Sequence, residues 1–366
     1  MRVRGLFEHF EEYGWETPSR EIAERVGLPV GEIVRLDTNA SPFRPSGALS
    51  DLARAAQGLE VNQYPDTSYL DLREALSDYT GKGIERFVVT NGADEGLDIA
   101  TKVLLDPGDE VIVPTPTYSM YRIAASIMGA KVVSVDRRPD FGLDVERMLA
   151  AVGPRTRAIF LCNPNNPTGS LSPVEDVERL AGSGVAVVVD EAYFEYCGRS
   201  AIDLTDRLEN VVVCRTLSKA FSMAGVRVGY LVAKEETTKV LNAVRPPNSL
   251  SVISLFLAQS ALADHRGEMR KDVAATVEER GRLLRSLGEV EGVRAYPSET
   301  NFVLFRVRGS EAEAVHSRLM STGLVLRNLS RNRGTEGCLR TTVGTPEVNA
   351  RLVAGLRDAL APGQKR

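Results

Sequence analysis

Seven short runs of apolar residues recur along the middle of the chain. They lie at residues 87–90, 110–113, 131–135, 158–162, 185–190, 211–214 and 226–232. Continuous apolar runs of this length are typical of strands buried on both faces, and most segments between them have the spacing of amphipathic helices. The pattern predicts an α/β fold with one large domain, built on a mostly parallel seven-stranded sheet with helices on both sides.

The pattern changes after about residue 246. A long helical stretch is predicted over residues 250–287, followed by strands near residues 300–307, 324–327 and 338–343 and helices near residues 310–320 and 346–360. This mixture predicts a smaller α+β domain. We therefore expect an N-terminal arm over residues 1–35, a large cofactor-binding domain over residues 36–246 and a small domain over residues 247–366.

Local signals predict where two helices begin and end. In the arm, Ser19 is a suitable N-cap and Gly27 a suitable stop for a short helix. A second helix is expected to begin at Ser68, which has the spacing of a capping box with Asp71, and to end before Gly81. Both predicted starts depend on a side chain that satisfies the free amide groups of the first turn.

Polar residues follow several of the apolar runs. In sheets of this class, ligands bind at the carboxyl ends of the strands. The residues at these positions are Asn91–Asp94, Asn163–Gly169, Asp190 and Thr216–Lys219. They are therefore the first candidates for a functional site.

The position of Lys219, shortly after a buried strand, is unusual for a lysine. Burial disfavours the charged form of an amine, and a neutral amine can form a Schiff base with an aldehyde. Thr216, Ser218 and Arg227 lie close in the sequence and supply hydroxyl and guanidinium groups suited to a phosphate. An aldehyde that carries a phosphate is pyridoxal 5′-phosphate, which is the predicted cofactor. A solvated surface lysine is the alternative.

A carboxylate, Asp190, ends the apolar run at residues 185–190. Burying a carboxylate is costly unless it is paired, and a protonated pyridine nitrogen is a partner that keeps the cofactor ring an electron sink. Capping of the next helix is the alternative. Tyr193 lies three residues further on, where a helical turn would put it on the same face as Asp190. It can donate to the cofactor's 3-hydroxyl group or serve only in core packing.

Four further segments carry candidates. Asn166 lies in the turn CNPNNPTG, where prolines and a glycine hold a side chain in place toward the 3-hydroxyl group. The segment NGADE at residues 91–95 opens a helix whose amides can bind phosphate, although Asp94 can equally be an N-cap. Tyr118 can stack on a flat ring or pack in the core. Arg340 can bind a substrate carboxylate or form a structural salt bridge.

Composition narrows the function classes. The formal net charge is −4, so no basic surface favours nucleic acid or an anionic membrane. No apolar run approaches the roughly 18 residues of a membrane span, and the N-terminus lacks the apolar core of a secretory signal. The cysteines are scattered and the histidines isolated, which favours buried thiols in a reducing cytoplasm and argues against a metal site.

Together these segments resemble the fold-type I, class I and II aminotransferases, and most closely the histidinol-phosphate aminotransferase branch. The resemblance covers nearly all residues from about 32 to 345 and rests on LDTNASPFRPS, QYPDTSYLDLREAL, TNGADEGLD, PTYSMY, CNPNNPTGS, VVDEAYFEY, RTLSKAFSMAGVRVGY, NFVLF and LRTTVGT. It implies a biosynthetic enzyme that moves an amino group between an amino acid or amino alcohol phosphate and 2-oxoglutarate. It also implies a cytoplasmic homodimer whose active sites are shared between subunits.

The resemblance also assigns roles to individual residues. Lys219 holds the cofactor and shuttles the proton, Asp190 pairs with the pyridine nitrogen, and Asn166 and Tyr193 hold the 3-hydroxyl group. The implied phosphate-binding residues are Ala93, Asp94, Ser218 and Arg227, with Tyr64 reaching in from the partner subunit, and Tyr118 stacks on the ring. The implied substrate-binding residues are Asn39, Arg327 and Arg340.

One loop departs from the branch. Residues 39–41 read Asn-Ala-Ser instead of Asn-Glu-Asn, and Phe43 and Arg44 replace a pair of small residues. That loop lines the substrate entrance in the family, so the donor stays open. The alternatives are a pyridoxal-phosphate-dependent decarboxylase or cyclising enzyme resembling threonine-phosphate decarboxylase, an aromatic amino acid aminotransferase, a cofactor-binding regulatory module, and an α/β domain without a cofactor.

Overall fold

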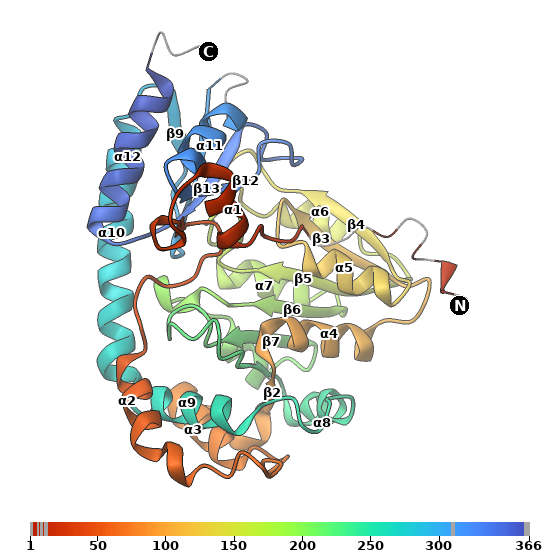
Figure 1. Cartoon of the computed structure of the whole chain (residues 1–366). Helices are drawn as coiled ribbons and strands as arrows, with labels where there is room; N and C mark the ends of the chain where they lie inside the picture. Colours follow the sequence, from red (N-terminus) through yellow and green to blue (C-terminus); the bar gives the residue numbers. More distant parts are fainter. Residues whose placement is uncertain (1–2, 6, 8–9, 11–13, 309–311, 362–366) are drawn as a thin grey trace.

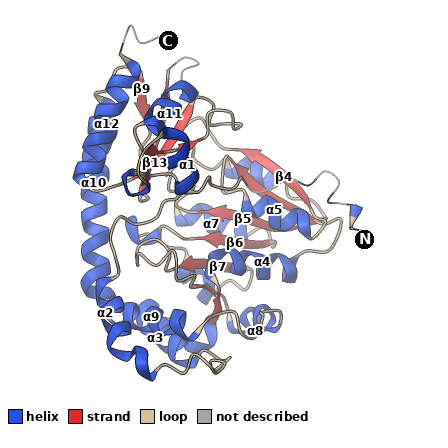
Figure 2. Ribbon diagram, in the orientation of Figure 1, coloured by secondary structure: helices blue, strands red, loops and turns tan. Residues whose placement is uncertain are grey.

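The structure of the protein is a computed structural model that describes residues 3–5, 7, 10, 14–308 and 312–361. A seven-stranded sheet lies in the middle of the molecule and a four-stranded sheet lies above it in the view of Figure 1. Helix α10 (Arg270–Gly288) runs along one side, from helices α2 (Ser46–Ala55) and α9 (Val252–Ala263) to the four-stranded sheet. Figure 2 shows how helices surround the strands of both sheets.

The large sheet confirms the sequence prediction. Its strands are β2 (Phe87–Thr90), β3 (Glu110–Thr115), β4 (Lys131–Asp136), β5 (Thr156–Cys162), β6 (Ala186–Asp190), β7 (Val211–Thr216) and β8 (Gly229–Val232). Their order across the sheet is β2-β8-β7-β6-β5-β3-β4. The strands from β7 to β4 pair in parallel, whereas β8 is antiparallel to both of its neighbours. The sheet is therefore mostly parallel, as the apolar runs indicate.

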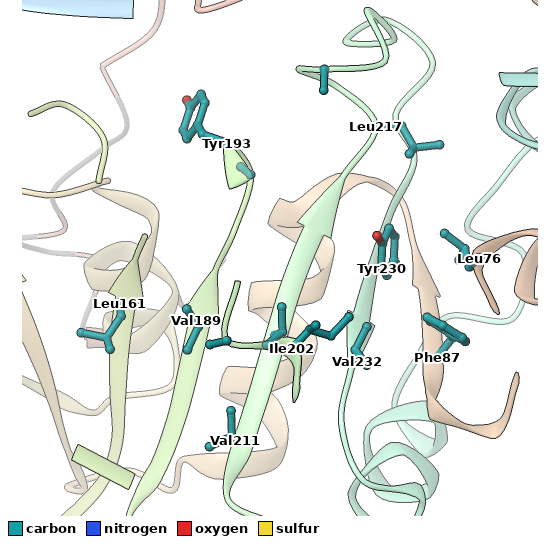
Figure 3. Packing of buried hydrophobic residues seen from close by; sticks show 14 of the residues in the cluster. Leu76, Phe87, Leu161, Val189, Tyr193, Ile202, Val211, Leu217, Tyr230 and Val232 are labelled. Atoms are coloured by element: carbon teal, nitrogen blue, oxygen red, sulfur yellow. The ribbon is translucent and has the colours of Figure 1, made fainter. Parts of the chain in front are cut away.

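Helices bury both faces of this sheet. They are α3 (Leu70–Thr80), α4 (Gly92–Leu104), α5 (Met120–Ile127), α6 (Val145–Ala150), α7 (Val174–Ala181) and α8 (Glu235–Ala243). On β6, Val187 and Val189 belong to one apolar cluster and Val188 to another, and all three are fully buried. Figure 3 shows side chains of the first cluster along β5, β6 and β8. Burial on two faces explains why these strands are apolar throughout instead of alternating.

The C-terminal part forms a second, antiparallel sheet in the order β12-β13-β10-β9. Its strands are β9 (Val293–Ala295), β10 (Phe302–Val307), β12 (Arg327–Asn328) and β13 (Cys338–Thr342), and helices α10, α11 (Ala312–Ser321) and α12 (Pro346–Leu360) pack on it. Strand β1 (Val34–Arg35) pairs in parallel with β11 (Leu324–Val325), so the N-terminal segment joins this part of the molecule. The domain boundaries near residues 36 and 246 stay predictions.

Two predicted helix starts are wrong. Helix α1 (Ser19–Val26) follows Pro18, and Ser19 is its first helical residue instead of its N-cap. Helix α3 begins two residues later than expected and has no side-chain cap. Ser68 donates its amide and its hydroxyl group to Asp66, so the expected capping box does not form. The Ser68 side chain, which was expected to cap the helix, forms its hydrogen bond within the loop that precedes the helix.

The predicted helix stops are confirmed. Gly27 and Gly81 follow α1 and α3 with φ values of 71° and 74°, the left-handed conformation that glycine adopts readily. The helical stretch predicted over residues 250–287 is present but interrupted. A π-helical turn, His265–Met269, separates α9 from α10.

The described part of the chain contains no membrane-spanning helix, no metal-binding cluster and no disulfide bond. Among the described residues, no helix combines the length and the apolar character needed to cross a membrane. In the same part of the chain, no group of three or more metal-binding side chains comes together. All four cysteines are free, and Cys162, Cys214 and Cys338 are buried, as the apolar surroundings of three cysteines predict.

Candidate active site

The carboxyl ends of β5, β6 and β7 lie side by side at one edge of the large sheet. In the register of the sheet, Asp190 of β6 is level with Cys162 of β5. The loops that leave these three strands carry Asn166, Tyr193 and Lys219. Because parallel strands end at the same edge, residues far apart in the sequence meet there.

Lys219 lies just beyond the end of β7 and is partly buried. Its Nζ donates a hydrogen bond to the main-chain oxygen of Thr38 at 3.2 Å and lies 5.8 Å from the centre of the Tyr193 ring. Burial, assisted by the nearby Arg340 guanidinium, lowers the pKa of Lys219 to about 8. About half of the amine is therefore neutral at pH 8, as nucleophilic attack on an aldehyde requires.

Asp190 is held from both sides at the end of β6. Its Oδ2 accepts a hydrogen bond from the Tyr121 hydroxyl group at 2.7 Å, and its Oδ1 accepts one from the amide of Ala192 at 3.0 Å. Burial raises the pKa of Asp190 to about 6, although both hydrogen bonds oppose that rise. Each carboxylate oxygen can accept a further hydrogen bond, so the group can pair with a protonated ring nitrogen.

Tyr121 is a site residue that the sequence patterns did not indicate. Its side chain is fully buried, its ring stacks on Phe160 with centroids 5.8 Å apart, and it meets the Tyr118 ring edge-on. A tyrosine within an apolar helix face needs a partner for its hydroxyl group. The need for a hydrogen-bond partner was the signal in the sequence that could have pointed to Tyr121, although only the structure shows that the partner is Asp190.

Tyr193 contacts Asn39, which lies in the loop at residues 39–41. Asn39 Nδ2 donates to the Tyr193 hydroxyl oxygen at 3.0 Å, and the Tyr193 ring meets Phe302 edge-on at 5.2 Å. Tyr193 does not share a helical face with Asp190, because the chain forms a turn before the 3₁₀ helix Phe194–Tyr196. Asn39 Oδ1 is buried without a hydrogen-bond partner among the described residues, so it can accept from a ligand.

Arg340 on β13 joins two of the loops at the site. Its Nη1 donates to Asn166 Oδ1, and its Nη2 donates to the main-chain oxygen of Asp37 at 2.6 Å. The guanidinium lies over the Phe302 ring, 5.2 Å from its centre, and the residue is buried. Arg340 and Lys219 donate to the main-chain oxygens of adjacent residues, Asp37 and Thr38, and the positive charge of Arg340 helps to lower the pKa of Lys219.

A second arginine lies beside Arg340. Arg327 on β12 is directly opposite Arg340 in the antiparallel pair β12–β13, so both side chains leave the same face of the sheet. Arg327 Nη1 pairs with the Glu16 carboxylate at 3.2 Å. Like charges at directly opposite positions destabilise a sheet. The pair therefore favours an anion at this face.

The start of α4 faces Arg227 and forms an anion-binding end of the site. Gly92 has a φ value of 77°, and a Cβ atom there would lie 2.5 Å from Arg227 Nη2. Arg227 donates to Ser218 Oγ at 3.4 Å and to Asp94 Oδ2 at 3.3 Å. The first amides of a helix have no partner within the helix, so those of Ala93 and Asp94 add donors for a phosphate.

Three predicted residues have contacts that the sequence did not specify. Tyr118 donates from its hydroxyl group to Asp94 Oδ1 at 3.0 Å. Asp94 is not the N-cap of α4, because Asn91 takes that position. The Thr216 hydroxyl lies 2.9 Å from Ser218 Oγ, so it helps to orient the Ser218 side chain. Tyr64 lies apart from these hydrogen bonds on a loop before α3 and is 84% exposed.

Comparison with known proteins identifies the class of protein. A model of the family "Aminotransferase class I and II" matches residues 31–356. The chain belongs to this family, so it is an enzyme that transfers amino groups between small molecules and uses pyridoxal 5′-phosphate as its cofactor.

The curated relatives have a more specific name. Histidinol-phosphate aminotransferase from Caldanaerobacter subterraneus subsp. tengcongensis is 38% identical over 330 residues, which cover 89% of this chain and 93% of the relative. The enzyme of the same name from Methanosarcina mazei is 39% identical over 347 residues, covering 94% and 92%. The crystal structure of histidinol-phosphate aminotransferase from Sinorhizobium meliloti with pyridoxal-5′-phosphate has a TM-score of 0.87 at 27% identity, covering 98% and 97%.

The side chains at the sheet edge fit this cofactor. Lys219 supplies an amine of lowered pKa for the aldehyde, and Asp190 supplies a buried carboxylate with room for one more donor on each oxygen. Arg227 lies against Gly92 at the start of α4 and donates to Ser218, so both side chains can join the free amides of that helix in binding a phosphate group. The buried and unpaired Asn39 Oδ1 is a further sign that a ligand with a hydrogen-bond donor belongs here.

Proposed function

We propose that the protein transfers the amino group of histidinol phosphate to 2-oxoglutarate, as a cytoplasmic homodimer with shared active sites. The names of the relatives at 38% and 39% identity support the donor. The arginine pair Arg327 and Arg340 carries the proposal, because it offers two cations on one face of the sheet, and Arg340 bonds to the residue before the one that Lys219 bonds. A donor with a phosphate and an acceptor with two carboxylates both need such a pair.

Lys219 moves the proton in this proposal. When bound, pyridoxal 5′-phosphate supplies an electron sink that stabilises negative charge at the α-carbon of the donor. Lys219 Nζ takes the proton that leaves this carbon and holds it for the return step. The pKa of about 8 allows the amine to gain and lose a proton near the pH of the cytoplasm.

The other side chains bind and orient. Asp190, held by Tyr121, keeps a proton on the ring nitrogen, while Tyr193 and Asn166 hold the 3-hydroxyl end. The phosphate end is bound by the amides of Ala93 and Asp94 and the side chains of Ser218 and Arg227. Arg340 binds the carboxylate of the 2-oxo acid, with Asn39 and Arg327 as further substrate contacts.

A panel of half-reactions tests the donor. Each of four compounds, histidinol phosphate, histidinol, phenylalanine and glutamate, is mixed with the cofactor-loaded protein, and absorbance follows conversion to the pyridoxamine form. The proposal predicts fast conversion with histidinol phosphate and glutamate and slow conversion with histidinol, which lacks the phosphate. Equal rates with histidinol and histidinol phosphate would contradict the proposed donor. Absence of conversion with every donor would count against transamination.

The shared active site is proposed from exposed side chains on one part of the surface. Val61, Tyr64, Leu70 and Ile253 are exposed around α3 and α9. Mixed dimers of the Lys219→Ala and Tyr64→Ala variants test the arrangement. If Tyr64 serves the partner subunit, one of the two sites in a mixed dimer is intact, and mixing restores activity. If Tyr64 serves its own subunit, no site is intact and mixing restores nothing.

A further inference from the structure

The segment from Gly14 to Ser19 lies against two arginines. They are Arg327 on β12 and Arg35 on β1, the strand that pairs with β11. Arg327 donates to the main-chain oxygen of Gly14 and to the Glu16 carboxylate, both at 3.2 Å. Arg35 donates to the main-chain oxygen of Thr17 at 2.8 Å and to Ser19 Oγ at 3.4 Å. The segment is thus fixed along the edge of the site, with Glu16 as its acidic side chain.

Glu16 lies where the charges of the site favour an anion. Its partner Arg327 is directly opposite Arg340, whose guanidinium contacts the Asn166 loop. The Arg35 guanidinium is also near enough for Glu16 to stabilise its charge. Glu16 thus offsets part of the positive charge of Arg327 and Arg35, although Arg35 also pairs with Asp37 at 2.6 Å. Glu16 therefore pairs with the arginine that, in the proposed function, contacts an anionic group of the substrate.

We propose that Glu16 is a specificity-determining residue: it neutralises Arg327 until the phosphate of the donor displaces it. This inference rests on the proposed function, because it assumes a donor with a second anionic group. The side chains of Arg327 and Glu16 are 28% and 30% exposed, and an ion pair as exposed as this is weak. A phosphate, which offers more charge and more acceptor oxygens than a carboxylate, outcompetes it.

The consequence is a selectivity that depends on charge. Part of the binding free energy of a phosphorylated donor is used to break the Glu16–Arg327 ion pair. A donor without a second anionic group leaves this ion pair in place, so its binding free energy is not reduced. Loss of the Glu16 charge therefore strengthens the binding of phosphorylated donors and leaves that of uncharged side chains as it is.

The substitution Glu16→Gln tests this directly, with Glu24→Gln as a matched control. Glu24 lies on α1 and pairs with Arg20, so its loss changes the net charge equally without touching Arg327. For Glu16→Gln we expect KM for histidinol phosphate to fall roughly 2- to 5-fold, the fold-change that corresponds to a weak exposed ion pair. KM for phenylalanine should not change. Inhibition by inorganic phosphate should become stronger by a similar factor.

The outcomes separate this inference from the proposed donor. A purely structural role for Glu16 would change KM for all donors alike, and that result would overturn the inference. An unchanged phosphate inhibition constant in Glu16→Gln, or the same change in Glu24→Gln, would overturn it too. If histidinol phosphate is not a substrate of any variant, the proposed donor fails. The phosphate inhibition constants, measured with glutamate as donor, then still decide whether Glu16 competes for Arg327.

Discussion

Replacing Tyr121 with phenylalanine removes the hydroxyl group that donates to Asp190 Oδ2 and preserves the ring that stacks on Phe160. The variant therefore isolates one hydrogen bond to a buried carboxylate. Such bonds to charged groups contribute about 1.5–3 kcal/mol. Because 1.36 kcal/mol corresponds to one pKa unit, the pKa of Asp190 should rise by about 1 to 2 above its value of about 6.

The sign of the effect on stability follows from this pKa. Burial already holds the folded-state pKa of Asp190 above that of the unfolded chain. As pH rises, the unfolded chain loses this proton first, so the stability of the cofactor-free protein falls until the folded-state pKa is passed. In Tyr121→Phe the fall continues to a higher pH. The variant should differ little from the parent at pH 5 and be less stable by about 1.5–3 kcal/mol at pH 8.5.

Urea unfolding of the cofactor-free protein at these two pH values measures the difference. Tyr296→Phe is a suitable control, because Tyr296 is also buried but packs on Phe141 in a separate apolar cluster. Affinity for pyridoxal 5′-phosphate, followed by absorbance, should fall in Tyr121→Phe and not in the control. A loss of stability that is equal at pH 5 and pH 8.5 would instead show that Tyr121 contributes packing and does not stabilise the Asp190 charge.

Two further predictions concern the cofactor site. The rate at which the cofactor-free protein captures pyridoxal 5′-phosphate should rise about 5-fold from pH 7 to pH 8 and level off above that, because neutral Lys219 reacts and its pKa is about 8. Arg340→Gln should move this pH profile to higher pH, because the Arg340 charge helps to lower that pKa. An unchanged profile would contradict the role of the Arg340 charge. Gly92→Ala should destabilise the protein by about 1–2 kcal/mol and weaken cofactor binding, because φ is 77° and the new Cβ would meet Arg227. Urea unfolding measures the stability and cofactor titration measures the affinity. Gly108→Ala is the control, because Gly108 also has a positive φ but a Cβ atom there would meet no other residue.

Much of the fold could be predicted because its signal is local. The seven apolar runs match the seven strands, since a strand buried on both faces must be apolar along its whole length. The meeting of Lys219, Asp190 and Asn166 followed from the rule that parallel strands end at one edge. The start of α3 could not be predicted in this way, because Ser68 had two possible local partners and Asp66 took it.

The contacts that complete the site depend on packing between distant segments. Tyr121 and Asp190 are 69 positions apart, Asn39 and Tyr193 are 154 apart, and Glu16 and Arg327 are 311 apart. Each of these side chains has several polar partners that the sequence alone would allow. Only the folded chain decides between them, which is why Asn39 could be assigned to the site by resemblance but its contact with Tyr193 could not.

Trapping the cofactor on the protein identifies the residue to which it binds. The protein loaded with pyridoxal 5′-phosphate is reduced with borohydride and digested, and mass spectrometry locates the pyridoxyl group. The label is expected on Lys219, between the carboxyl end of β7 and Arg227, and Lys219→Ala should acquire none. A label on another lysine, or an equal amount of label in the Lys219→Ala variant, would contradict it.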